Sequence, residues 1–150
     1  MSNLLSFKSI FGWISISENK NKILSVSFGK RKNRGKSKSL FKLKSILNNY
    51  LLGKTQKLDF LILLDGTKLQ IRIWNELKKI PYGQTRSYGE IAKKVNTSPR
   101  YVGNVCGQNK HLLLIPCHRV IRSNGHLGGF SGLGGLKLKQ YLLNLENKNS

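Results

Sequence analysis

Apolar and polar residues alternate in two stretches near the beginning of the chain. Residues 13–17 read Trp-Ile-Ser-Ile-Ser, and residues 23–28 read Ile-Leu-Ser-Val-Ser-Phe. A period of two is typical of half-buried strands, and the polar residues 19–22 between them favour a turn. Helical spacing follows at 40–52, and the apolar run 58–64 predicts another buried strand. This half of the chain is expected to form a small sheet with one helix.

Beyond Asp65-Gly66 the apolar spacing becomes helical. It predicts a helix over 69–80, which the Pro-Tyr-Gly sequence at 81–83 ends. A glycine-rich loop at 125–135 precedes a last amphipathic helix at 136–145. The change in pattern divides the chain into two domains. We predict an N-terminal α/β domain with a basic loop at 1–66 and a second, mainly helical domain at 67–150, whose function is argued below.

Two short helices in the second half are separated by a tight turn. Ser87 is a suitable N-cap for a helix at 88–95, with a glutamate three positions later. Ser98 caps the next helix, 99–108, whose first residue is proline, where a missing backbone donor does no harm. This pattern predicts a helix-turn-helix, a motif that often binds DNA.

Composition adds a strong preference for polyanions. Lys and Arg outnumber Asp and Glu by 27 to 6, for a formal net charge of +21 in 150 residues. Such a field attracts nucleic acid. A membrane surface, an acidic protein partner and simple compositional bias remain alternatives at this point.

The most basic segment, 30–38, contains no acidic residue. Over 30–44, three interpretations are open: added phosphate contacts, a disordered surface loop, or composition alone. The charge density favours the disordered loop.

Cysteine usage and the N-terminus set the expected compartment. The two cysteines do not form the framework of a secreted, disulfide-rich protein. Residues 1–17 lack a clean signal-peptide pattern, and no apolar stretch is long enough to span a bilayer. We expect a cytoplasmic protein.

One motif carries the chemistry. Residues 115–121 read Ile-Pro-Cys-His-Arg-Val-Ile and place Cys117 beside an imidazole and a guanidinium. Apolar strands are expected on either side of it, at 112–115 and 120–121. A thiol reacts as the thiolate, and nearby cations lower its pKa. Cys106 lies in a helical apolar stretch without such neighbours, so Cys117 is the candidate nucleophile.

The complete series of motifs is specific. In chain order it comprises Ile-Pro-Tyr-Gly-Gln-Thr-Arg-Ser-Tyr-Gly-Glu-Ile-Ala at 80–92, Ser-Pro-Arg-Tyr-Val-Gly at 98–103, Asn109, Pro-Cys-His-Arg-Val-Ile at 116–121 and Leu-Gly-Gly-Phe-Ser-Gly at 127–132. This series resembles the methylated-DNA–protein-cysteine methyltransferases. The resemblance implies an α/β (α+β) fold, with a small ribonuclease-H-like domain followed by a mainly helical, winged-helix-like domain that carries the helix-turn-helix.

The resemblance also implies a reaction. Members of the family move an alkyl group from the 6-oxygen of guanine in DNA onto their own cysteine, here Cys117, and are used once. Activity on the 4-oxygen of thymine is left open. A water molecule would bridge His118 and Cys117, and Glu146 on the last helix would orient the imidazole of His118. Asn144 is the only nearby competitor for the position of Glu146, and it cannot serve as a carboxylate. Tyr88 would assist the departing guanine.

Further positions are implied for DNA and the base. Arg100 would fill the space left by a flipped nucleotide, and Gly103 would let its helix approach the minor groove. Asn109 would brace the active-site loop. The remaining substrate- or DNA-contacting positions are Phe130, Ser131 and Arg119. The expected partner is double-stranded DNA containing alkylated guanine, with no membrane, no metal and no cofactor, and the protein is expected to be a monomer.

Simpler interpretations and other functions stay open from the sequence. His118 could bond to the backbone, Tyr88 could be an ordinary core tyrosine, and Arg100 could contact a phosphate. Rival functions are a lesion-binding relative that lacks the cysteine, a cysteine hydrolase, and a basic helix-turn-helix regulator. Cys117 argues against the first, and irreversible stoichiometric labelling would exclude the second.

Overall fold

The computed structural model describes residues 2–128 and 135–150, which form two compact units. Unit 1 comprises residues 1–64 and 110–114, and unit 2 comprises residues 65–109 and 115–150. Residues 110–114, which the sequence analysis counted with the second domain, therefore belong to unit 1. Two of the predicted site residues, Phe130 and Ser131, lie outside the described residues.

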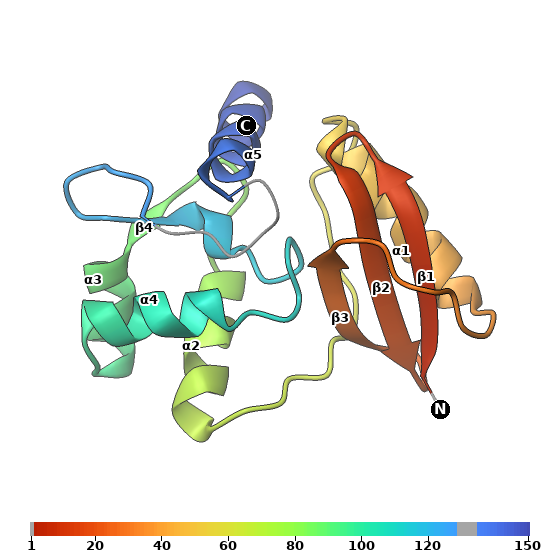
Figure 1. Cartoon of the computed structure of the whole chain (residues 1–150). Helices are drawn as coiled ribbons and strands as arrows, with labels where there is room; N and C mark the ends of the chain where they lie inside the picture. Colours follow the sequence, from red (N-terminus) through yellow and green to blue (C-terminus); the bar gives the residue numbers. More distant parts are fainter. Residues whose placement is uncertain (1, 129–134) are drawn as a thin grey trace. The chain divides into compact units, whose positions relative to one another are not determined.

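Unit 1 is built on an antiparallel sheet in the order β1-β2-β3. Its elements are β1 (Asn3–Ser9), β2 (Gly12–Asn19), β3 (Lys22–Phe28) and α1 (Lys38–Leu51). The Ser37 side chain caps α1 by accepting from the Leu40 N–H. The helix packs against β1 and β2 (Figure 1). The alternating pattern at 13–17 and 23–28 correctly predicted β2 and β3.

Two predicted strands are absent from the described chain. Residues 58–64 make only an isolated parallel bridge, Ile23 to Ile62, and none of their side chains is buried. Residues 112–115 form a turn in which Leu113 has φ +73°. Both segments are apolar, but apolarity alone does not supply the continuous ladder of backbone partners that a strand needs.

The basic segment is ordered along β1, so the expectation of a disordered loop is wrong. Arg34 and Leu4 exchange two backbone hydrogen bonds, of 2.8 and 2.9 Å. The Asn33 side chain accepts from the Ser6 N–H at 2.8 Å. Gly35 has φ +70°, a conformation that favours glycine, and a Cβ there would displace the Asn3 side chain.

Unit 2 contains most of the helices. Its elements are α2 (Lys68–Lys78), β4 (Arg86–Ser87), α3 (Tyr88–Val95), α4 (Pro99–Gly107), a 3₁₀ turn at Cys117–Arg119, β5 (Val120–Ile121) and α5 (Gly135–Asn149). The predicted helices and the strand at 120–121 are confirmed, with small shifts at their ends. The α/β fold class is also confirmed, whereas the finer ribonuclease-H-like description of the N-terminal part stays a prediction.

The helix-turn-helix follows from local capping. Ser87 and Glu90 form a complete capping box at the start of α3. Asn96 ends α3 in the left-handed conformation, at φ 59° and ψ 56°. Ser98 then caps α4 by accepting from the Tyr101 N–H. The indole Nε1 of Trp74 on α2 donates to the Val105 carbonyl at 3.3 Å, which fastens α4 to α2.

Among the described residues, every helix is too short or too polar to span a bilayer.

Candidate active site

A short parallel strand pair brings two distant segments together. β4 pairs with β5 through Arg86–Val120 and Ser87–Ile121. Tyr88 follows β4 directly, and the Cys117 turn directly precedes β5. The start of α3 therefore lies beside the candidate nucleophile.

Cys117 occupies a fixed, buried turn. Its N–H donates to the Ile115 carbonyl at 2.8 Å, and its side chain is 3% exposed. The Asn109 amide Nδ2 donates both to the Ile115 carbonyl at 3.0 Å and to the Cys117 Sγ at 3.4 Å. Asn109 is buried, so it holds the sulfur and its loop from inside the protein.

A buried acid–imidazole pair lies next to the cysteine. The His118 Nε2 and the Glu146 Oε2 are 2.7 Å apart, and both side chains are almost fully buried. Burial acts to raise the pKa of Glu146, but hydrogen bonds from His118 and Arg119 outweigh it and lower the pKa to about 2. Burial lowers the pKa of His118 in spite of the carboxylate. The imidazole is therefore neutral at physiological pH and can accept a proton.

Arg119, predicted to contact substrate or DNA, binds groups of the protein in this structure. Its Nε and Nη2 donate to the two Glu146 carboxylate oxygens at 2.7 and 2.9 Å. Its Nη1 donates to the Ile80 carbonyl at 2.8 Å. A buried guanidinium needs such partners to compensate for lost hydration. Arg119 therefore ties α5 and the end of α2 to the nucleophile turn.

Burial raises the pKa of the Cys117 thiol, and two side chains and the backbone N–H of Cys117 itself oppose this effect. The two side chains are the Asn109 amide and the ammonium of Lys139. From the sequence, the imidazole of His118 and the guanidinium of Arg119 were expected to favour the thiolate, but both side chains bind the Glu146 carboxylate. The side chains that favour the thiolate thus come from outside the Pro-Cys-His-Arg motif.

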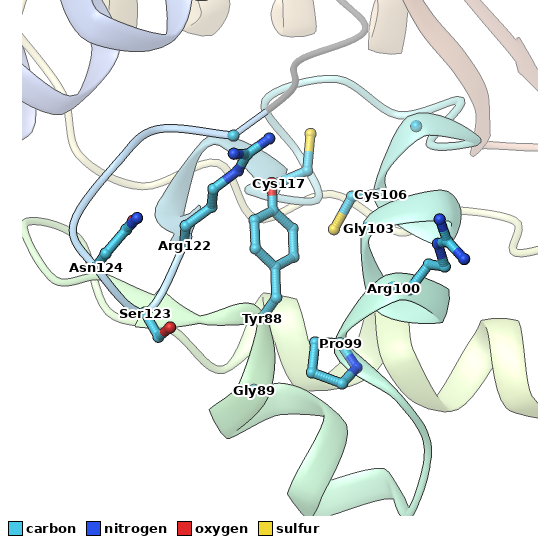
Figure 2. Close-up of a pocket in the computed structure, with 12 residues that line it drawn as sticks. Tyr88, Gly89, Pro99, Arg100, Gly103, Cys106, Cys117, Arg122, Ser123 and Asn124 are labelled. Atoms are coloured by element: carbon cyan, nitrogen blue, oxygen red, sulfur yellow. The ribbon is translucent and has the colours of Figure 1, made fainter.

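A cavity of about 680 Å³ is lined in part by Cys117. Figure 2 shows the residues of its wall. This volume lies within the range of sites for small ligands. Cys117 forms part of its wall, together with Tyr88 from α3 and Arg100 and Gly103 from α4. Gly103 lies against the Tyr88 ring, where an added Cβ would be 3.9 Å from Cε1. Arg100 is exposed on the first turn of α4.

Comparison with known proteins identifies this arrangement. The family model described as "6-O-methylguanine DNA methyltransferase, DNA binding domain" matches residues 68–148. This chain belongs to that family.

Relatives in the 6-O-methylguanine DNA methyltransferase family support the assignment. The methylated-DNA--protein-cysteine methyltransferase of Methanosarcina acetivorans is 43% identical over 102 residues, which cover 67% of this chain and 64% of that protein. The inducible enzyme of Bacillus subtilis is 42% identical over 106 residues, covering 69% and 58%. The matches thus span less than two thirds of these curated relatives.

Solved structures extend the similarity over the whole chain. The Mycobacterium tuberculosis O6-methylguanine methyltransferase is 31% identical, with a TM-score of 0.85 and coverage of 100% of this chain and 95% of that one. M. tuberculosis OGT in complex with DNA is 32% identical, with a TM-score of 0.87 and coverage of 98% and 94%.

The family motifs alone did not reveal Lys139. Its side chain is fully buried, and its ammonium donates to the carbonyls of Val120, at 2.7 Å, and Leu127. The ammonium also lies 3.5 Å from the Tyr88 hydroxyl. The sequence did contain an indication of this residue. Lys139 lies seven residues before Glu146, so the two share one face of α5. A charged residue on an apolar face marks a site worth testing.

The sequence also did not show that Cys106 lies at the site. It lines the same cavity as Cys117 and Tyr88 (Figure 2). Burial and the neighbouring Cys117 raise the pKa of Cys106 to about 12. It therefore stays a thiol at neutral pH, and its place in the wall is compatible with an unreactive role.

Proposed function

We propose that this protein repairs DNA by moving an alkyl group from the 6-oxygen of guanine to Cys117. The carrying observation is a buried thiol on the wall of a cavity, followed directly in the chain by a buried imidazole that pairs with the Glu146 carboxylate. The Cys117 sulfur forms a bond to the alkyl carbon as the bond to O6 breaks. The thioether is stable, so each molecule acts once.

The proton of Cys117 has a plausible acceptor in His118. Because Nε2 faces Glu146, the proton reaches the other ring nitrogen, Nδ1, through a water molecule. The ionised Glu146 then stabilises the imidazolium that forms. Asn109 and Lys139 stabilise the thiolate directly.

Tyr88 is the proposed donor to the departing guanine. Burial and the two nearby thiols raise its pKa to about 12, so its hydroxyl is protonated at neutral pH. Net transfer leaves the thiol proton on the guanine and the alkyl group on the sulfur. Gly128 leaves room for this hydroxyl: it has φ +72°, and a Cβ there would lie 2.7 Å from the Tyr88 oxygen.

The proposed substrate is duplex DNA, engaged by the helix-turn-helix of α3 and α4. A relative of known structure has been crystallised with DNA. Arg100 would fill the space of the flipped nucleotide, and Gly103 would allow close approach of α4. Phe130 and Ser131 are proposed to face the base. We further propose a monomer that needs no metal or cofactor and works in the reducing cytoplasm, where its two free cysteines stay reduced.

Intact-protein mass spectrometry after incubation with a 6-O-methylguanine duplex tests this function. A gain of one methyl group mapped to Cys117 is the expected result. An unchanged mass with DNA still bound would favour a lesion-binding or regulatory protein instead. Release of an unmodified protein together with altered DNA would favour a hydrolase.

Replacing Arg100 by alanine should slow transfer from duplex DNA more than transfer from free O6-benzylguanine. The free base needs no flipping, so only the duplex reaction loses the wedge. The two single-turnover rate constants provide the measurement, with Arg72→Ala on the exposed face of α2 as the control. Equal losses on both substrates would contradict the role of Arg100.

Replacing Lys139 by methionine should raise the pKa of Cys117, since the thiolate loses its positive neighbour. A rise of one unit makes the thiolate about tenfold scarcer at neutral pH. The pH profile of transfer from free O6-benzylguanine should therefore shift upward. Lys137→Met, at an exposed position of the same helix, should leave it in place. A lower rate with an unshifted profile would mean that Lys139 is only structural.

A further inference from the structure

Arg122 adds a charged group to the cavity that the proposed mechanism does not use. It follows β5 directly, and its side chain lines the cavity together with Cys117 and Tyr88 (Figure 2). Its backbone is held in a turn, because its N–H donates to the His126 carbonyl at 2.8 Å and its carbonyl accepts from the Gly125 N–H at 2.9 Å. The Arg122 residue is exposed, so its guanidinium on the cavity wall is accessible to a bound anion.

The charge of Arg122 is not neutralised within the described chain. Among residues 2–128 and 135–150, no hydrogen bond or ion pair engages its guanidinium. By contrast, Arg119 is fully committed to Glu146. The described cavity wall contains no Asp or Glu, and the sequence of residues 129–134 contains none either.

Other features of the wall also favour a negative charge. The first turns of α3 and α4 reach the cavity through Tyr88 and Gly89 and through Pro99 and Arg100. Helix N-termini carry partial positive charge. The guanidinium of Arg122 and the hydroxyl end of Tyr88 lie on the same side of the cavity (Figure 2). An anion bound there would be close to the reacting sulfur.

We propose that Arg122 binds an oxyanion of the substrate within this cavity. Guanidinium groups bind carboxylates and phosphates through paired hydrogen bonds. Two parts of the substrate have this chemistry: a carboxylate on the O6 substituent, as in O6-carboxymethylguanine, and the phosphate next to the target nucleotide. This inference rests on the proposed function and deepens it by naming a substrate class, guanines with an anionic group at the lesion.

Transfer of a carboxymethyl group forms and breaks the same bonds as methyl transfer. The Cys117 thiolate forms a bond to the methylene carbon as the bond from that carbon to O6 breaks. The thiol proton ends on the guanine, and the carboxylate takes no part in the bond changes. It stays paired with Arg122 in the S-carboxymethylcysteine product.

Three duplexes that differ only in the O6 group separate the two oxyanions. They carry methyl, carboxymethyl, or carbamoylmethyl, which has nearly the shape of carboxymethyl without its charge. Transfer rate constants are measured for the wild type, Arg122→Gln, and Arg72→Gln as a charge-matched control outside the cavity. Arg122→Gln should lower the ratio of carboxymethyl to carbamoylmethyl rates by roughly 10- to 100-fold, as loss of a charged hydrogen bond predicts. Arg72→Gln should leave that ratio unchanged.

The other outcomes are equally decisive. If Arg122→Gln slows all three duplexes by one factor while sparing free O6-benzylguanine, the bound oxyanion is the phosphate. If no duplex responds, or if Arg72→Gln has the same effect, the proposal is overturned. Binding of the carboxymethyl and carbamoylmethyl duplexes to Cys117→Ala and to Cys117→Ala with Arg122→Gln gives a readout that needs no transfer. If the wild type transfers nothing, the proposed function fails, and this affinity ratio still decides the role of Arg122.

Discussion

Replacing Cys117 by alanine is expected to abolish alkyl transfer completely while leaving DNA binding close to that of the wild type. The sulfur is the only group in the proposed site that bonds to the alkyl carbon, so no neighbouring residue can compensate. The helix-turn-helix and the exposed Arg100 are unchanged by the substitution. Intact-protein mass spectrometry and DNA affinity, measured on the same preparation, test the two halves of this prediction.

Cys106→Ala is the matched control for that experiment. Both cysteines line the cavity, but the Cys106 thiol has a pKa of about 12 and lacks the hydrogen bond that Asn109 gives to Cys117. The Cys106 variant should still gain one alkyl group per molecule. A gain that persists in Cys117→Ala and disappears in Cys106→Ala would assign the acceptor to the wrong cysteine.

Replacing Glu146 by glutamine should destabilise unit 2, because the buried side chains of His118 and Arg119 lose their anionic partner. The glutamine keeps the shape but has only one accepting oxygen, and its NH₂ group would face the donors of Arg119. Breaking a buried ion pair from one side costs about 3–5 kcal/mol of unfolding free energy. Denaturant unfolding measures this loss. Glu76→Gln, which breaks the exposed pair with Lys79, should cost less than about 1 kcal/mol.

The buried contacts of Glu146 also predict how the unfolding free energy of the wild type depends on pH. Folded Glu146 keeps its charge down to about pH 2, whereas the unfolded carboxyl is protonated near its ordinary pKa of 4.5. The unfolded state therefore binds more protons between these values, and the unfolding free energy falls as the pH falls from about 4.5 to about 2. The loss amounts to about 3 kcal/mol. Buried His118 adds to it below about pH 6.5, since its pKa is also lowered.

Glu146→Gln removes this carboxyl titration, so its stability should vary less than that of the wild type between pH 4.5 and pH 2. Unfolding curves at several pH values compare the two proteins. A variant as stable as the wild type at pH 7, with the same acid dependence, would show that the Glu146 contacts do not stabilise the fold.

Local signals in the sequence predicted the parts of the molecule that depend on neighbouring residues. Ser87 and Ser98 were recognised as helix caps because a cap bonds to the backbone two or three positions away. The alternating pattern predicted β2 and β3 because successive side chains of a strand point to opposite faces of the sheet. The motif around Cys117 identified the candidate nucleophile, and the motif series identified the family.

Tertiary structure decided which partner each buried polar side chain has. The sequence could not show that Arg119 binds Glu146, 27 residues away, or that Lys139 reaches the carbonyls before and after the Arg122 turn. It also could not show that Cys106 shares the cavity of Cys117. These contacts depend on the packing of α5 and α4 around the nucleophile turn, and such packing brings together residues far apart in the chain.

The same distinction explains the wrong predictions. Residues 58–64 have the composition of a strand, but a strand needs a neighbour with a continuous run of free backbone groups. Among the residues that the structure describes, only Ile23 pairs with this segment. The basic residues 30–38 have the composition of a disordered loop, yet Arg34 exchanges two backbone bonds with Leu4 of β1 and the Asn33 side chain accepts from Ser6. Composition determined the net charge, and the order of neighbouring residues determined the helix caps and the reactive motif. The pairing of distant backbone and buried side chains decided the geometry of the site, because those energies arise only when the chain is folded.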